Sequence, residues 1–146
     1  MPIRPATEAD LPKLCGKIAT SIQVNAKDDL ADDLAFVIAK NGIENLQRHL
    51  ATRDMFVFEQ NCCIIGTVRL DGNRLNSLYV DIHSMKAGIG RQLVEHVEML
   101  AFSRGVSTML VSSSRTAVAF YQKLGYTKLN FEPREFAPTW AMEKQL

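Results

Sequence analysis

The sequence predicts an α/β (α+β) fold: one mixed, twisted, mostly antiparallel sheet with a central parallel pair of strands, flanked by helices. Three observations lead to this prediction. Helical periodicity dominates the first fifty residues, strands joined by short turns follow over residues 55–82, and helices then alternate with strands to the end. The strand–helix–strand unit over residues 75–111 predicts a parallel pair, because a helix between two strands carries the chain back so that the second strand runs in the same direction as the first. The 146 residues fit one domain, 1–146.

Apolar spacing and helix-ending residues define each element. Thr7 is placed as the N-cap of the first helix, and Asp10, three residues later, completes a capping-box variant. Gly105 and Gly125 each follow a helix, as glycine commonly does. The expected helices cover residues 7–22, 28–40, 43–50, 88–104 and 115–124. The expected strands cover residues 3–6, 55–58, 63–70, 75–82, 108–111, 126–131 and 140–144, with turns at 60–61 and 71–73.

Composition excludes several classes of protein. Hydrophobic residues make up 47% and charged residues 23%, and the net charge of +1 gives no field that favours nucleic acid or a membrane surface. No apolar run is long enough to cross a bilayer, and the N-terminus lacks a secretory leader, so we expect a cytoplasmic protein. Cys15, Cys62 and Cys63 form neither a disulfide framework nor a zinc pattern. We expect them to be reduced and mostly buried, with no metal site.

The most informative segment is a strand that runs into a loop, two glycines and a helix. Gly88 and Gly90 allow close approach of a ligand, and the start of a helix offers unpaired N–H groups and a partial positive charge. These features suit a phosphate. A Rossmann fingerprint needs a third glycine where Leu93 stands, and a Walker A loop needs Lys-Ser/Thr where Arg91-Gln92 stand. A packing turn with two small residues remains the alternative.

Residues 78–91 (LYVDIHSMKAGIGR) resemble motif A of the GCN5-related N-acetyltransferase (GNAT) family, with Val80, Gly88 and Gly90 at the expected spacing. Residues 117–126 (AVAFYQKLGY) resemble motif B of the same family. The opening residues 3–10 and the closing residues 142–146 are also similar, so the resemblance covers nearly the whole chain. Departures occur at Ile82, where the family has proline, and at Met85, where it has Gln or Arg. Ser114 replaces a frequent asparagine before motif B.

The resemblance implies the acyl-CoA N-acyltransferase (GNAT) fold and an acetyl-CoA-dependent N-acetyltransferase that acts on a primary amine. It places coenzyme A in an opening between strands four and five, with a backbone N–H near Val80 as oxyanion donor. It implies Tyr121 as general acid for the departing thiolate, although helical spacing alone would make Tyr121 a core aromatic. The cofactor-binding residues implied are Leu78, Tyr79, Val80, Met85, Lys86, Ala87, Gly88, Ile89, Gly90, Arg91, Ser114 and Tyr121.

The residues alone leave several candidates for the general base. Family members often carry an acid where Asn76 stands, and an amide has no acid–base function. Glu59, Asp81 and His83 are nearby; pleat alternation is expected to point Asp81 away from the acceptor. We predict deprotonation through ordered water, with His83 as the best single side chain. The acceptor is not identified: a small amine, an antibiotic, a peptide N-terminus and a lysine remain. A homodimer is compatible with these predictions. A non-catalytic CoA-binding or interaction module on the same fold is the alternative function.

Overall fold

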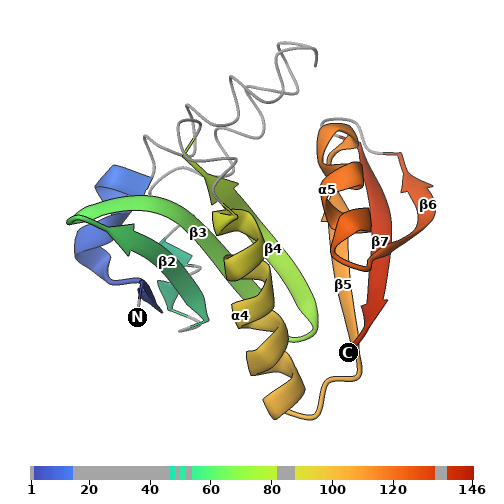
Figure 1. Cartoon of the computed structure of the whole chain (residues 1–146), viewed down its shortest axis with the longest axis horizontal. Helices are drawn as coiled ribbons and strands as arrows, with labels where there is room; N and C mark the ends of the chain where they lie inside the picture. The colour runs from blue at the N-terminus through green and yellow to red at the C-terminus, as the bar shows by residue number, and fades with distance from the viewer. Residues whose placement is uncertain (1, 15–46, 49, 52–53, 82–87, 134–137) are drawn as a thin grey trace.

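The computed structural model describes residues 2–14, 47–48, 50–51, 54–81, 88–133 and 138–146. In this part of the chain, strands form one seven-stranded sheet in the order β1-β2-β3-β4-β5-β7-β6 (Figure 1). β4 and β5 run parallel and the other neighbouring strands are antiparallel. The predicted mixed sheet with one parallel pair is therefore confirmed. The helix predicted over residues 28–40, and most of the one over 43–50, lie outside the described residues.

The first half of the sheet is a meander with tight turns. It consists of β1 (Ile3–Pro5), β2 (Met55–Gln60), β3 (Cys63–Asp71) and β4 (Arg74–Val80). The turn between β2 and β3 is built on Asn61 and Cys62, whose φ angles are 53° and 63°. Cys62 and Cys63 are exposed. The prediction that the cysteines are mostly buried is therefore wrong for these two, because Cys62 lies in the hairpin turn, which projects its side chains into solvent, and Cys63 is the exposed first residue of β3. Cys15 lies outside the described residues.

β4 separates from its parallel neighbour halfway along its length. Only the first two residues of β4 pair with β5 (Thr108–Ser113), where they oppose Leu110 and Val111. Just beyond them, Ser77 has a φ of 54° and the register between β4 and β3 shifts. An extra residue in one strand of a pair bends that strand. β4 therefore turns away from β5, and the two strands diverge from their paired ends (Figure 1).

Helix α4 (Ile89–Ser103) covers one face of the sheet and buries a stripe of apolar side chains against it. Two of its side chains pack directly against Gly66 of β3. A Cβ atom at this position would lie 2.8 Å from Cδ1 of Leu93 and 3.2 Å from Cγ2 of Ile89, so only glycine fits without movement. The helix agrees with the predicted span within one residue at each end. Among the described helices, none combines the length and the apolarity needed to cross a bilayer.

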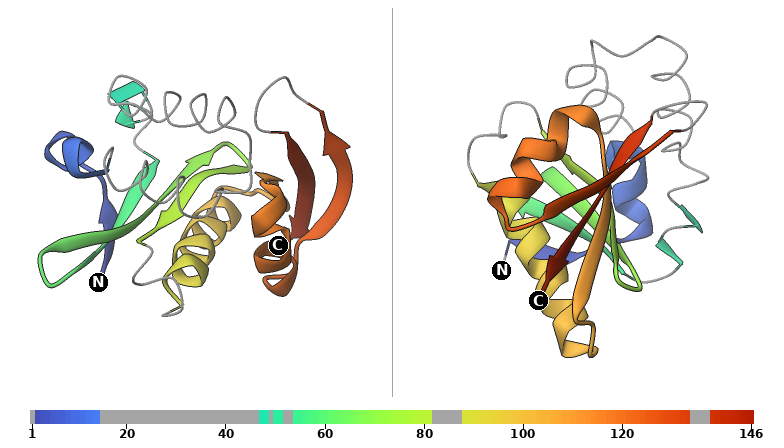
Figure 2. Two further views of the ribbon diagram at one scale, coloured as in Figure 1. Left: turned by 90° about the horizontal axis from the view of Figure 1, so that it is seen from above. Right: turned by 90° about the vertical axis from the view of Figure 1, so that its right-hand side faces the viewer.

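The second half of the sheet carries its own helix. β5 is followed by the 3₁₀ turn η3 (Arg115–Ala117), α5 (Val118–Lys123), β6 (Thr127–Glu132) and β7 (Thr139–Gln145). Gly125, with a φ of 99°, closes α5 as predicted. α4 and α5 lie on the same face of the sheet, and the N-terminal helical turn lies on the opposite face (Figure 2).

A buried polar cluster joins α4 to the second half of the sheet. The hydroxyl of Tyr126 donates to Oε2 of Glu98 at 2.9 Å, and Nζ of Lys144 donates to Oε1 of the same carboxylate at 3.2 Å. Glu98 is buried, with 8% of its surface exposed. Because both carboxylate oxygens are engaged, the cluster compensates the desolvation of this charge and fixes α4 against β7.

The N-terminus is held by an arginine shared between two acids. The guanidinium of Arg4 donates to both oxygens of Asp10 at 2.9 and 3.0 Å and to Glu59 on β2 at 3.0 Å. Asp10 ends the turn η1 (Glu8–Asp10) and accepts from the backbone N–H of Thr7 at 2.7 Å. The predicted reciprocal contact between Asp10 and Thr7 is thus confirmed. Residues 11–14 continue the turn as a helix.

We expect Asp10 to make stability depend on pH below neutrality. The hydrogen bonds from Arg4 lower the pKa of Asp10 from its ordinary value of 3.8 to about 2. A shift of this size corresponds to roughly 2 kcal/mol of stabilisation, fully present above about pH 5 and lost as the pH falls towards 2, because the unfolded chain takes up the proton first. Urea unfolding of wild type and Asp10→Asn at several pH values measures it. The two proteins should converge at low pH; a constant difference would contradict the assignment.

Candidate functional site

The start of α4 presents backbone N–H groups for which the described residues provide no acceptor, beside a space that no described residue fills. Gly88 is the N-cap, with a left-handed φ of 75° that favours glycine. The first backbone bond of the helix runs from the N–H of Gln92 to the carbonyl of Gly88 at 3.1 Å, so the N–H groups of residues 89–91 have no acceptor within the helix. Nothing in the described part of the chain lies within 4 Å of a Cβ built on Gly88. An anion therefore has room beside the positive end of the helix.

Three elements meet at Gly90. A Cβ built on Gly90 would lie 3.1 Å from Cζ of Phe120 on α5 and 3.6 Å from Cγ2 of Val80 on β4. The missing side chain lets both elements approach the first turn of α4. The two motifs recognised in the sequence are therefore brought together, at the end of β4 that has separated from β5.

Arg91 and Ser114, two predicted cofactor-binding residues, both have side-chain contacts in the structure. The Nε of Arg91 donates to Oε1 of Glu95 at 2.9 Å, and both side chains are exposed. The guanidinium thus lies along α4, while the backbone N–H of Arg91 remains at the helix start. Ser114 is the N-cap of η3, and its hydroxyl lies 3.2 Å from the hydroxyl of Thr116. His83 and the predicted cofactor-binding residues 85–87 lie outside the described residues.

Tyr121 is buried among aromatic rings. Its ring packs edge-to-face against Phe120 at 5.1 Å and against Tyr126 at 5.5 Å, and 5% of its surface is exposed. Burial raises the pKa of Tyr121 well above its usual value of 10, and Tyr79 adds to this shift. The phenol is therefore neutral over the physiological range and retains its proton. This packing agrees with both predicted interpretations, a core aromatic and a donor to the departing thiolate.

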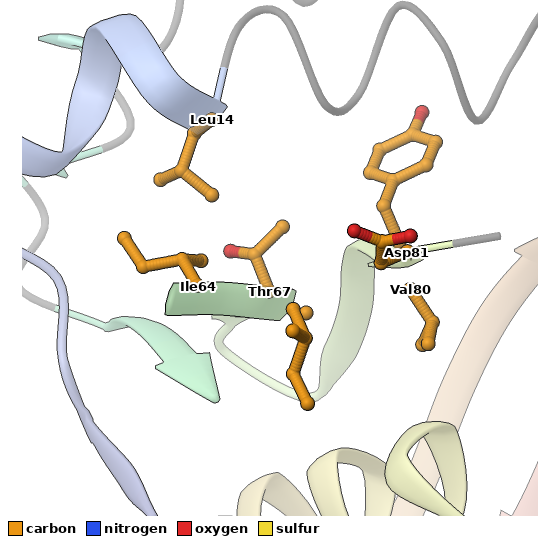
Figure 3. A pocket seen from close by; sticks show the side chains of 8 residues that line it. Leu14, Ile64, Thr67, Val80 and Asp81 are labelled. Atoms are coloured by element: carbon orange, nitrogen blue, oxygen red, sulfur yellow. The ribbon is translucent and has the colours of Figure 1, made fainter. Parts of the chain in front are cut away.

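A pocket lies on the opposite side of the sheet from α4. It is lined by Leu14, by residues 64–67 of β3 and by residues 79–81 at the end of β4. Figure 3 shows the side chain of Val80 pointing towards α4, whereas Leu14, Thr67 and Asp81 lie on the other side of the strands. The hydroxyl of Thr67 donates to the carbonyl of Phe56 at 2.9 Å.

The other candidate bases lie in different surroundings. Glu59 accepts a hydrogen bond from Arg4 at 3.0 Å, which commits it to the N-terminal ion pair. Asn76 stands opposite Arg69 of β3, towards the closed end of the β4–β5 pair. Arg69 is mostly buried, and burial lowers the pKa of its guanidinium. Leu14 and Thr67 were not predicted as site residues, because their only signal in the sequence is the apolar or β-branched character expected of a core.

Comparison with known proteins identifies the family. The model of the acetyltransferase (GNAT) domain matches residues 27–145. The peptidyl-lysine N-acetyltransferase YjaB of Salmonella typhimurium is 34% identical over 62 residues, which are 42% of this chain and 41% of that protein. The match therefore spans less than half of the curated relative.

Solved structures share the whole fold. A GCN5-related N-acetyltransferase from Rhodopseudomonas palustris has a TM-score of 0.91 at 22% identity, over 99% of this chain and 94% of that one. The PaiA N-acetyltransferase of Thermoplasma acidophilum, solved with coenzyme A, has a TM-score of 0.82 at 19% identity, over 99% and 98% of the two chains. Since the family model covers most of the sequence and the architecture agrees, the chain belongs to the GNAT acetyltransferase family.

Proposed function

We propose that this protein is an acetyl-CoA-dependent N-acetyltransferase that transfers the acetyl group to a primary amine. The observation that carries the proposal is the convergence, at Gly90, of the first turn of α4, the separated end of β4 and the start of α5. The names of the relatives support the same activity, since those compared above are N-acetyltransferases.

The described residues fit the phosphates and the arm of coenzyme A. The N–H groups of residues 89–91 have no acceptor within the helix, and the open surface over Gly88 leaves room for a pyrophosphate beside them. Beyond Leu75, β4 no longer pairs with β5 in the described part of the chain, and the arm of coenzyme A is proposed to lie along the separated strand. The backbone of Leu78 and Val80 lies in this part of β4.

Two groups of the protein would stabilise the developing charges. A backbone N–H near Val80 is proposed as the donor to the carbonyl oxygen of the acetyl group; one such fixed donor is worth about 2.7–4 kcal/mol in a comparable site. Tyr121 is proposed to donate a hydrogen bond to the departing sulfur. Its raised pKa suits this role, because the phenol stays protonated at any pH at which the amine reacts.

Thiol release from acetyl-CoA tests the function. We expect the purified protein to release free thiol only when a primary amine is present, and mass spectrometry should show the amine gaining one acetyl group. The panel should include a lysine-containing peptide, a diamine, an aminoglycoside and a peptide with a free N-terminus. Tight binding of coenzyme A without turnover on any amine would instead indicate a non-catalytic CoA-binding module.

A glycine substitution tests the cofactor site. Gly88→Val places a β-branched side chain at the helix start, where a phosphate would approach, so calorimetry should show loss of acetyl-CoA binding. Gly72→Val is the matched control, since Gly72 also has a positive φ (63°) and an open Cβ position, but lies at the tip of the β3–β4 hairpin. Both variants carry similar backbone strain. Equal affinity of a folded Gly88→Val for acetyl-CoA would remove the phosphates from this turn.

A pair of tyrosine substitutions tests the donor to sulfur. Tyr121→Phe keeps the ring and removes the hydroxyl, and we expect kcat to fall roughly 10²–10⁴-fold with little change in acetyl-CoA affinity. Tyr126→Phe is the control: its hydroxyl is bound to Glu98, so the substitution should lower thermal stability and leave kcat nearly unchanged. If Tyr121→Phe turns over like wild type, Tyr121 is a packing residue.

A further inference from the structure

We propose that Cys62 and Cys63 form a two-sulfur site for a soft, thiophilic metal ion, and that Cu(I) is the ion that suits it. The site lies at the tip of the β2–β3 hairpin and does not depend on the acetyltransferase function proposed above. The evidence comes from the exposure of the two thiols, from the conformation of the turn and from the number of ligands that the turn offers.

Both sulfurs are accessible to an ion from solvent. Cys62 and Cys63 are exposed, and neither takes part in a disulfide. Free cysteine is among the most buried residue types, so packing does not explain two adjacent exposed thiols. Cys62 also has a left-handed φ of 63°, which costs a residue with a side chain on the order of 1 kcal/mol. Neither packing nor backbone preference therefore accounts for cysteine at these two positions.

The turn allows both side chains to serve one ion. In a regular strand, adjacent side chains point to opposite faces, and two neighbouring cysteines could not share a metal. Cys62 is a turn residue, however, together with Asn61, whose φ is 53°, and Cys63 pairs with Gln60 as the first residue of β3. The left-handed residue interrupts the alternation of side chains at this point. Since the Cα atoms of adjacent residues are about 3.8 Å apart, both sulfurs can reach one ion beyond the tip.

The kind and number of ligands select the ion. Thiolates favour Cu(I), Zn(II) and iron–sulfur clusters over Mg(II) and Ca(II). Structural zinc takes four ligands, and iron–sulfur clusters are held mainly by four cysteines. Within the described ranges of the chain, no group of three or more His, Cys, Asp or Glu side chains is placed to hold a metal. Two thiolates therefore suit Cu(I), which needs only two sulfur ligands. The expectation of no metal site rested on the spacing that zinc requires.

The acid that lies closest in sequence does not compete for this role. Glu59 accepts a hydrogen bond from Arg4 at 3.0 Å, so its carboxylate is neutralised by the N-terminal arginine. The binding step then involves the two sulfurs alone. Two thiols and one Cu(I) ion give a bis-thiolate complex of charge −1, and two protons are released to solvent. No electron is transferred, so the step needs neither an oxidant nor a reductant.

Competition with a chromogenic Cu(I) chelator, in the absence of oxygen, provides the main test. We expect wild type to withdraw about one Cu(I) ion per chain from the chelator. Cys62→Ser and Cys63→Ser should each lower the affinity roughly 10²-fold or more, because either variant leaves a single thiolate. Cys15→Ser is the matched control: it removes the third cysteine, which lies outside the described residues, and should leave affinity and stoichiometry unchanged.

Circular dichroism shows whether each variant is folded; since both thiols are exposed, serine should leave the fold intact. A wild-type affinity no tighter than that of the folded single-serine variants would mean that the sulfurs do not share an ion. One ion for every two chains, with a dimer in light scattering, would place the ion between two hairpin tips and contradict a site within one chain. Loss of binding in Cys15→Ser, or equally tight binding of Zn(II) by wild type, would show that further ligands are needed and would overturn the proposal.

Discussion

The bend in β4 at Ser77 is the constraint on which the rest of the site depends. A parallel ladder that continued past Leu75 and Val111 would occupy both strand edges with hydrogen bonds and leave no place for a ligand. The irregularity against β3 and the positive φ of Ser77 end that ladder after two pairs. A non-glycine residue in this conformation costs on the order of 1 kcal/mol, so contacts elsewhere must hold it in place.

Those contacts come from the two ends of α4. At its first turn, Gly66 and Gly90 allow side chains from the helix, β4 and α5 to approach closely. Near its last turn, the buried carboxylate of Glu98 joins Tyr126 and Lys144 across the separation of the two halves of the sheet. The helix therefore contacts both halves of the sheet, and these contacts hold the halves together where β4 and β5 are separated.

Much of the fold was predictable because it follows from local periodicity. The strands of the meander, the span of α4 and the closing glycine of α5 each have a signal within a few residues. The bend at Ser77 had none, since serine is not a residue that marks a left-handed position. The exposure of Cys62 and Cys63 was missed because composition describes where cysteines usually lie, whereas these two lie in the β2–β3 turn and at the first residue of β3.

Sequence motifs predicted one part of the candidate site, and the other part is visible only in the packing of the structure. Gly88 and Gly90 were found from spacing, because the need for a close backbone approach restricts the residue type. The pocket around Asp81 was not predicted: Leu14 and Ile64 are far apart in sequence and look like any core residue until the N-terminal helix is seen against β3.

The two faces of β4 have different surroundings at the end of the strand that has separated from β5. An anionic cofactor is favoured on the side of α4, where helical N–H groups are directed outwards, and Val80 faces that side. The pocket lined by Leu14, Ile64 and Thr67 lies on the other side. Because successive side chains of a strand alternate, the adjacent residues Val80 and Asp81 reach opposite faces, and the backbone between them lies at the end of the strand. The separation from β5 is what makes this backbone reachable from both sides.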